Sequence, residues 1–249
     1  MSGHSKWAQI KRKKQATDAK RGQLFTKLIR EITVAARAEG GDLDGNPRLR
    51  TAITAAKGAN MPLENIERAI KKGTGELPGV VYEEVSYEGY GPGGVAILVE
   101  ALTDNKNRTT SDIRHIFSNH GGSLGNTGCV VWIFQQKGIV TVSQSGCDEE
   151  ALMAIVLEAG AEDLQSDNGS FEILSPLNAL EDIKKALEEN GISYANAEIT
   201  RNPQTSVKIE GRQAQQVLKL VESLEEQEDV QKVYANFDIP EEMMVGIVE

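Results

Sequence analysis

Cysteine is scarce in this chain of 249 residues, which has only Cys129 and Cys147. The two lie far apart in the sequence and belong to no paired motif, which fits a reducing compartment rather than a disulfide framework. The three histidines, His4, His115 and His120, add no spacing typical of zinc ligands. We therefore expect a cytoplasmic protein without a metal site.

Long hydrophobic runs are also missing. No apolar run approaches the roughly 20 residues that are needed to span a bilayer. The amino-terminal segment is basic but lacks the apolar core of a signal peptide, and Ser2 stands where the myristoylation pattern requires glycine. The sequence thus predicts no membrane as a partner.

A catalytic constellation is not recognisable either. No Ser/His/Asp or Cys/His arrangement can be identified, and the acidic pairs Glu83–Glu84 and Glu225–Glu226 have the character of solvated charge. Gly89–Gly94 matches the G-x-G-x-x-G pattern, but a strand follows it where a dinucleotide site requires a helix, so a hairpin turn is favoured. We expect no enzyme, no cofactor and no small-molecule substrate.

What the sequence does have is positive charge concentrated at one end. Residues 1–72 hold 16 Lys/Arg against 7 Asp/Glu, whereas residues 73–249 hold 11 against 30, in a chain of net charge −10. This asymmetry is typical of a portion that binds a polyanion, attached to acidic domains. We therefore expect the basic end to bind nucleic acid, with the choice between DNA and RNA left open.

Residues 1–79 are expected to form a basic tail and a small helical domain. Apolar side chains at helical spacing predict a first helix over residues 17–39, ended by Gly40-Gly41. Asn46-Pro47 is typical of a capped helix start, and a third helix begins at Asn60-Met-Pro-Leu63 and ends at Gly73. Residues 73–79 then form a linker.

Beyond the linker the pattern changes to the two-residue period of strands. A strand around Val85, a strand at 95–101, a helix at 109–120 and a strand at 129–135 predict a ββαβ unit. Val130, Trp132 and Phe134 share one side of the last strand. Residues 137–202 predict βαββαβ, a complete ferredoxin-like set, and residues 205–239 predict a further strand, helix and strand.

The two incomplete pieces, 80–136 and 203–241, are expected to form one discontinuous central domain. Neither piece buries its strands alone, so a shared sheet with 137–202 inserted between them is the economical arrangement. The predicted fold is α+β, with an N-terminal three-helix domain followed by two ferredoxin-like α/β domains, the third inserted in the second.

Short motifs distributed over essentially the whole chain match a known pattern. They are Gly3-His-Ser-Lys-Trp7 with Ile10-Lys11, Asn60-Met-Pro62 with Arg68-Ala-Ile70, Gly89–Val95, Asn107-Arg-Thr109, Arg114 and Gly121-Gly-Ser-Leu-Gly125. Together they resemble the YebC/PmpR family.

The resemblance implies three domains and a cytoplasmic regulator of gene expression. Bacterial members are usually described as DNA-binding transcriptional regulators. The similarity extends to a mitochondrial translational activator of cytochrome c oxidase, and some bacterial members are described as relieving ribosome stalls at proline-rich stretches. The alternative is therefore a ribosome-associated RNA-binding translation factor, with ribosomal RNA and the ribosome as partners.

Candidate nucleic-acid contacts fall into three groups. The tail supplies Lys6, Trp7, Lys11, Arg12, Lys13 and Lys14, the first helix supplies Lys20, Arg21, Lys27 and Arg30, and the loop before the helix at 109–120 supplies Lys106 and Arg108. The basic side chains suit phosphates, which position a nucleic acid but carry no sequence information. For each group the alternative is an ordinary solvated surface.

Some of these side chains have a competing structural interpretation. Trp7 can stack on a base, but with Ile10 it can equally anchor the tail on the protein itself, which we favour. The loop at 103–109 can be an ordinary polar loop in which Thr109 caps the helix. Arg48, Arg50 and Lys57 rank below the twelve candidates.

Overall fold

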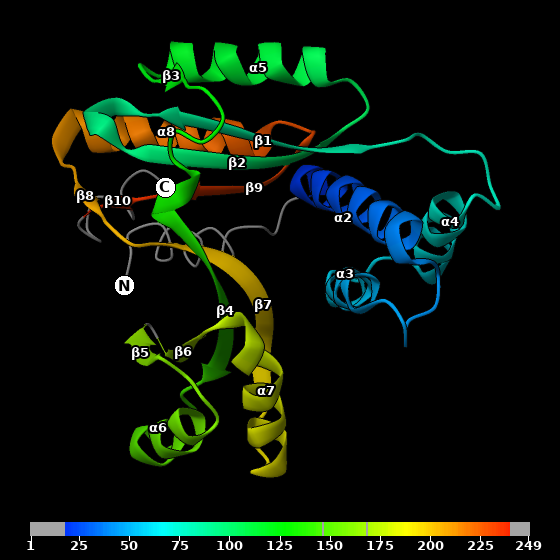
Figure 1. Cartoon of the computed structure of the whole chain (residues 1–249), viewed down its shortest axis with the longest axis vertical. Helices are drawn as coiled ribbons and strands as arrows, with labels where there is room; N and C mark the ends of the chain where they lie inside the picture. The colour runs from blue at the N-terminus through cyan, green and yellow to red at the C-terminus, as the bar shows by residue number, and fades with distance from the viewer. Residues whose placement is uncertain (1–17, 146, 168, 240–249) are drawn as a thin grey trace. The chain divides into compact units, whose positions relative to one another are not determined.

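The computed structural model describes residues 18–239, except residues 146 and 168. By its contacts the chain divides into two compact units. One runs from Trp132 to Thr205, and the other holds the remaining described residues (Figure 1).

The helical domain consists of α2 (Asp18–Glu39), α3 (Pro47–Gly58) and α4 (Leu63–Thr74). Asn46 is fully buried and joins two of these helices. Its side chain accepts the backbone N–H of Leu49 at the start of α3 and donates to the carbonyl oxygens of Ala35 and Gly40 at the end of α2. The predicted asparagine cap therefore also ends the preceding helix.

Close packing of α2 on α4 depends on a glycine. A Cβ atom at Gly73 would lie 2.5 Å from the carbonyl oxygen of Thr33 and 2.7 Å from the Cβ atom of Ala36. Both atoms belong to α2, so only a residue without a side chain lets α4 approach this closely.

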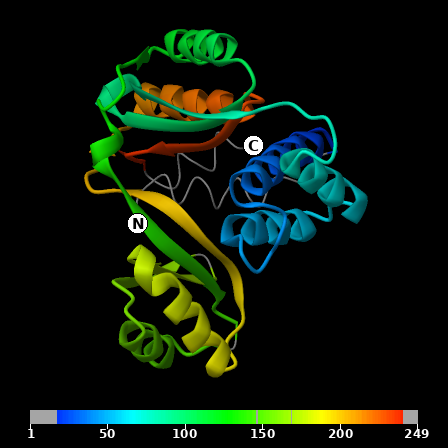
Figure 2. The same ribbon diagram turned by 45° about the vertical axis from the view of Figure 1, so that its right-hand side comes forward.

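The central sheet has the order β3-β1-β2-β9 and is antiparallel throughout. Its strands are β1 (Glu83–Tyr90), β2 (Ala96–Thr103), β3 (Ser123–Leu124) and β9 (Val230–Ala235). Helices α5 (Lys106–Asn119) and α8 (Gly211–Glu226) cover one face (Figures 1 and 2). Strands β8 (Val207–Lys208) and β10 (Phe237–Asp238) form a small parallel pair.

The other unit is a four-stranded antiparallel sheet of order β5-β6-β4-β7 with two helices. Its elements are β4 (Phe134–Ser143), α6 (Glu149–Glu158), β5 (Asp163–Asp167), β6 (Ser170–Ser175), α7 (Leu180–Glu189) and β7 (Tyr194–Pro203). A short 3-10 helix, η3 (Leu177–Ala179), precedes α7. The expected α+β fold, with this set inserted into the central domain, is confirmed, since β9 pairs with β2 across it.

The glycine stretch at 89–94 is a turn between antiparallel strands, as expected. A 3-10 helix, η1 (Pro92–Gly94), joins β1 to β2. Gly93 and Gly94 have φ of 74° and 79°, which glycine adopts readily. The three-residue η1 is followed by strand β2 and no α-helix starts within these glycines, so the dinucleotide interpretation has no structural basis here.

The expected strand at 129–135 is wrong. Residues 131–133 form a 3-10 helix, η2. Strand β4 starts at Phe134 and includes the first strand of the set expected at 137–202. The place at the sheet edge belongs to β3. Trp132, expected beside Val130 and Phe134, is 67% exposed whereas those two are buried.

Glu88 explains why no strand forms there. Its buried carboxylate accepts the backbone N–H groups of Gly128, Val130 and Val131 at 2.6, 2.7 and 2.8 Å. Amides that are held by a side chain are not available to a neighbouring strand. The alternation of apolar residues in this segment therefore does not produce a ladder.

No helix of the described residues is long and apolar enough to cross a membrane.

The Glu88→Gln substitution should destabilise the central domain by roughly 2–3 kcal/mol, because an amide cannot replace a charged carboxylate as the acceptor of three N–H groups. Urea unfolding measures the change. The matched substitution Glu83→Gln, on an exposed residue of the same strand, should stay within about 0.5 kcal/mol of wild type. Equal effects of the two substitutions would contradict the assignment.

The same carboxylate should make stability depend on pH. Burial alone would raise the pKa of Glu88, but the three amide donors outweigh it and hold the pKa below its ordinary value of 4.5. The stabilisation is therefore present above about pH 4.5 and is lost as the pH falls through the folded-state pKa. The difference in unfolding free energy between wild type and Glu88→Gln should be constant near neutral pH and shrink in acid.

Candidate nucleic-acid interface

The predicted tail contacts cannot be placed. Lys6, Trp7, Lys11, Arg12, Lys13 and Lys14 lie outside the described residues. Lys20 lies in the first turn of α2. The nucleic-acid contacts of the tail residues and of Lys20 remain predictions.

Two of the α2 cations contact the protein itself. Arg21 is exposed, and its guanidinium lies over the Phe25 ring at 5.4 Å from the ring centroid. The Lys27 ammonium donates to the backbone carbonyl oxygen of Glu225, at the end of α8, at 2.7 Å. Lys27 thus ties the helical domain to the central domain.

Arg30 is buried, with 8% of its surface exposed. Its Nη1 donates to Asp229 Oδ1 at 2.7 Å and to the backbone carbonyl oxygen of Glu228 at 2.9 Å, and its Nη2 donates to the Glu228 carboxylate at 2.8 Å. A second backbone oxygen, that of Leu102, lies 3.3 Å from Nη1. Arg30 is therefore a structural cation between α2 and the central sheet.

Asp229 accepts hydrogen bonds from two helices, α2 and α5. Besides Arg30, it accepts the Thr109 hydroxyl at 2.6 Å and Nη2 of Arg108 at 2.9 Å. Burial alone would raise the pKa of Asp229, but the hydrogen bonds from Thr109, Arg108 and Arg30 outweigh it and lower the pKa. The carboxylate consequently stays charged at neutral pH. We call Arg30, Arg108, Thr109 and Asp229 the Asp229 cluster.

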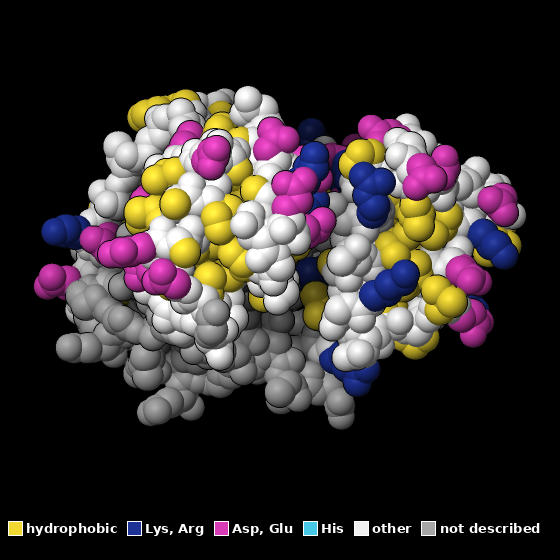
Figure 3. Space-filling view, turned by 90° about the horizontal axis from the view of Figure 1, so that it is seen from below, with side chains coloured by type: hydrophobic (Ala, Val, Ile, Leu, Met, Phe, Trp, Pro, Cys, Tyr) yellow, Lys and Arg dark blue, Asp and Glu magenta, His cyan; other side chains and the backbone are white. Residues whose placement is uncertain are grey.

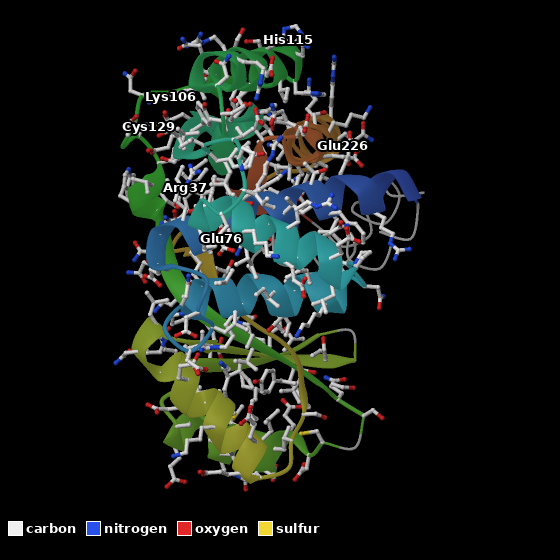
Figure 4. The ribbon with its side chains drawn as sticks, turned by 90° about the vertical axis from the view of Figure 1, so that its right-hand side faces the viewer. Arg37, Glu76, Lys106, His115, Cys129 and Glu226 are labelled. Carbon is white, nitrogen blue, oxygen red and sulfur yellow. The ribbon has the colours of Figure 1, made fainter. Side chains whose placement is uncertain are left out.

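The first turn of α5 corrects the expected loop. The helix starts at Lys106, three residues before the expected start, and its cap is Asn105, whose side chain accepts the N–H of Arg108. Thr109 is not the cap but a buried member of the Asp229 cluster. Lys106 is exposed at the first residue of α5 (Figure 4).

A hollow of about 400 Å³ lies beside the Asp229 cluster. It is lined by Arg30, Asp104, Arg108, Asp112, Gln227, Glu228 and Asp229. Both arginines are bound to carboxylates, since Arg108 also pairs with Asp104 at 2.7 Å. Four acidic side chains around two neutralised cations make a poor phosphate site.

Helix α3 offers a different arrangement, which the sequence interpretation ranked low. It contains three basic residues and no acid. Arg48 pairs with Glu31 and Glu84, but Arg50 and Lys57 are exposed. The two are seven residues apart, so they share one face about 10 Å apart along the axis. This spacing and the absence of acids were visible in the sequence.

Arg50 keeps most of its donors available. One guanidinium nitrogen donates to the carbonyl oxygen of Leu43 at 2.7 Å, which orients the group. A guanidinium has five N–H donors, so the others can meet a phosphate. Figure 3 shows Lys and Arg side chains on the helical domain, at the right of the view, separated by apolar and uncharged ones, with acids toward its rim.

The start of α4 has the opposite character. Glu64 lies in its first turn and Glu67 follows within one turn, both exposed. A recognition helix would present its first residues to base edges between two phosphate chains. Two carboxylates at that end disfavour a helix-turn-helix reading of duplex DNA by α3 and α4.

Among the residues that the structure describes, no group of three or more His, Cys, Asp or Glu side chains is placed to hold a metal ion.

The chain matches two family models that together cover nearly its whole length. Residues 5–76 match the TACO1/YebC protein N-terminal domain, and residues 82–237 match the TACO1/YebC second and third domain.

Similar proteins carry a regulatory name. A probable transcriptional regulatory protein of Desulforapulum autotrophicum is 57% identical over 243 residues, which is 98% of each chain. One of Syntrophus aciditrophicus is 56% identical over 245 residues, again 98% of each chain. The crystal structure of a conserved hypothetical protein from Aquifex aeolicus has a TM-score of 0.82 at 53% identity, covering 90% of this chain and 93% of that one.

The Asp229→Asn substitution should cost roughly 3–5 kcal/mol of folding free energy, because it leaves two arginines without their buried counter-charge. Urea unfolding followed by circular dichroism measures the loss. Asp112→Asn, a matched change at an exposed residue that lines the same hollow, should change stability by at most about 0.5 kcal/mol. A loss below about 1 kcal/mol for Asp229→Asn would mean that the cluster is not a stabilising centre.

Proposed function

Because the chain belongs to the TACO1/YebC family, we propose that it is a nucleic-acid-binding regulator of gene expression whose helical domain contacts phosphates. The regulatory names of its relatives support a role in regulation. In this proposal the protein is a DNA-binding transcriptional regulator, and phosphate contacts supply the affinity.

The observation that carries the proposal is the exposed basic face of α3. Arg50 and Lys57 stand on a helix without acids, whereas Arg30 and Lys27 are bound within the protein. The net charge of the residues around them has the same sign, since residues 1–72 hold more than twice as many cations as anions. Lys20, Arg21 and the tail cations extend this basic end along the chain.

An RNA target is the second candidate, and the start of α4 favours it. Glu64 and Glu67 oppose insertion of that helix end into a major groove, so sequence reading by a helix is not supported. Phosphate contacts without base reading suit the folded RNA of a ribosome as well as duplex DNA. The protein would then act as a translation factor.

Arg50→Gln with Lys57→Gln should weaken binding of labelled nucleic acid and flatten its salt dependence. Each lost phosphate contact lowers the log–log slope by about 0.9 on duplex DNA or about 0.7 on a single strand. Fluorescence anisotropy between about 50 and 200 mM salt measures both, with a duplex and an RNA hairpin as probes.

A matched control removes the same charge elsewhere. Lys184→Gln with Lys185→Gln, on α7 of the inserted unit, should leave affinity and slope unchanged. Unchanged binding by the α3 variant would remove α3 from the interface. Crosslinking in cells with sequencing of the bound nucleic acid then decides the target, through promoter peaks for DNA or clustered ribosomal reads for RNA.

A further inference from the structure

The inserted unit carries charge of one sign over a long stretch. Residues 138–183 contain ten Asp or Glu and no Lys or Arg. Such a surface repels nucleic acid and attracts cationic partners. Whatever binds here is chemically distinct from the partner of α3.

Helix α6 in this stretch has apolar side chains on its outer side. Leu152 and Val156 are fully buried against the sheet, but Met153 is 36% and Leu157 is 49% exposed. Met153 and Leu157 are four residues apart, so they lie one above the other on the surface of α6. Met153 and Leu157 do not belong to the hydrophobic core of the unit, which contains Leu152 and Val156.

The exposed apolar side chains continue onto a second element. Gly160 lies in the turn that follows α6, and a Cβ atom there would lie 3.1 Å from the Cβ atom of Ala179, so the end of α6 lies close to η3. Leu177, also in η3, is 42% exposed. We call Met153, Leu157 and Leu177 the α6 stripe. Helix η3 directly precedes α7, and Figure 1 shows α6 and α7 as neighbours in this unit.

Carboxylates border the α6 stripe. Glu150 lies one turn before Met153, Glu158 follows Leu157, and Asp182 lies in the first turn of α7 beside Glu181, whose carboxylate accepts the Lys184 ammonium. All four are exposed. Apolar patches with a charged rim are typical of protein docking sites, because the centre loses water and the rim selects the partner's charge.

We propose that the α6 stripe docks an amphipathic helix of a basic protein. Its apolar side would cover Met153, Leu157 and Leu177, and its Lys and Arg side chains would meet the acidic rim. A symmetric pairing of two copies through this surface is disfavoured, since two such acidic surfaces repel each other. This surface and its class of partner are separate from the α3 face and the nucleic acid of the proposed function.

The probe is a labelled synthetic peptide of about 18 residues with Leu at helical spacing and Lys on the remaining positions. The full-length protein should bind it more tightly than a peptide of equal composition in which the Leu residues do not share one face. Met153→Ser with Leu157→Ser should weaken binding by at least about tenfold, measured by fluorescence anisotropy. Glu150→Gln with Glu158→Gln should weaken binding chiefly at low salt.

The control is Leu63→Ser, which removes a 61% exposed leucine from α4 and should leave peptide binding unchanged. Leu157→Ser alone, with about half of that side chain exposed, keeps the test available if the double variant does not fold. Equal binding of the two peptides would overturn the proposal, because charge alone would then explain it. The proposal would also be overturned if the protein bound a labelled duplex, or self-associated in analytical ultracentrifugation, and Met153→Ser with Leu157→Ser abolished that binding or self-association.

Discussion

The charge of Asp229 is the constraint on which the placement of the helical domain depends. A buried carboxylate is costly unless donors surround it, and here the donors come from α2, through Arg30, and from α5, through Arg108 and Thr109. The carboxylate therefore joins the helical domain, α5 and the loop before β9 in one cluster. Because Arg30 and Arg108 are bound to Asp229 in the folded protein, they are not available to bind an anionic ligand.

The chain separates its charges by domain. The helical domain presents Arg50 and Lys57 on a helix without acids, and the inserted unit presents carboxylates over residues 138–183 without one cation. A chain with this division of charge can bind a polyanion through its basic end, while its acidic part repels the same polyanion. The same division gives the inserted unit a surface suited to a cationic protein, so two partners of opposite charge can be served without competition.

Much of the fold followed from local pattern. The three helices, the antiparallel hairpin at 89–94 and the βαββαβ set were predictable from spacing, caps and glycines, because those signals act over a few residues. The segment at 129–135 was not predictable, since Glu88, forty residues earlier, holds its amides. For the same reason the candidate site was only partly predictable: the sequence shows that Arg30 is basic but not that Asp229, some 200 residues on, is its partner.

Nucleic acid should contact the helical domain and not the acidic inserted unit. Ultraviolet crosslinking of the protein to bound nucleic acid, followed by mass spectrometry of the crosslinked peptides, tests it most directly. We expect crosslinks within residues 1–72, with α3 (Pro47–Gly58) among them, and none within residues 138–183. Crosslinks concentrated in the inserted unit, with α3 untouched, would contradict it.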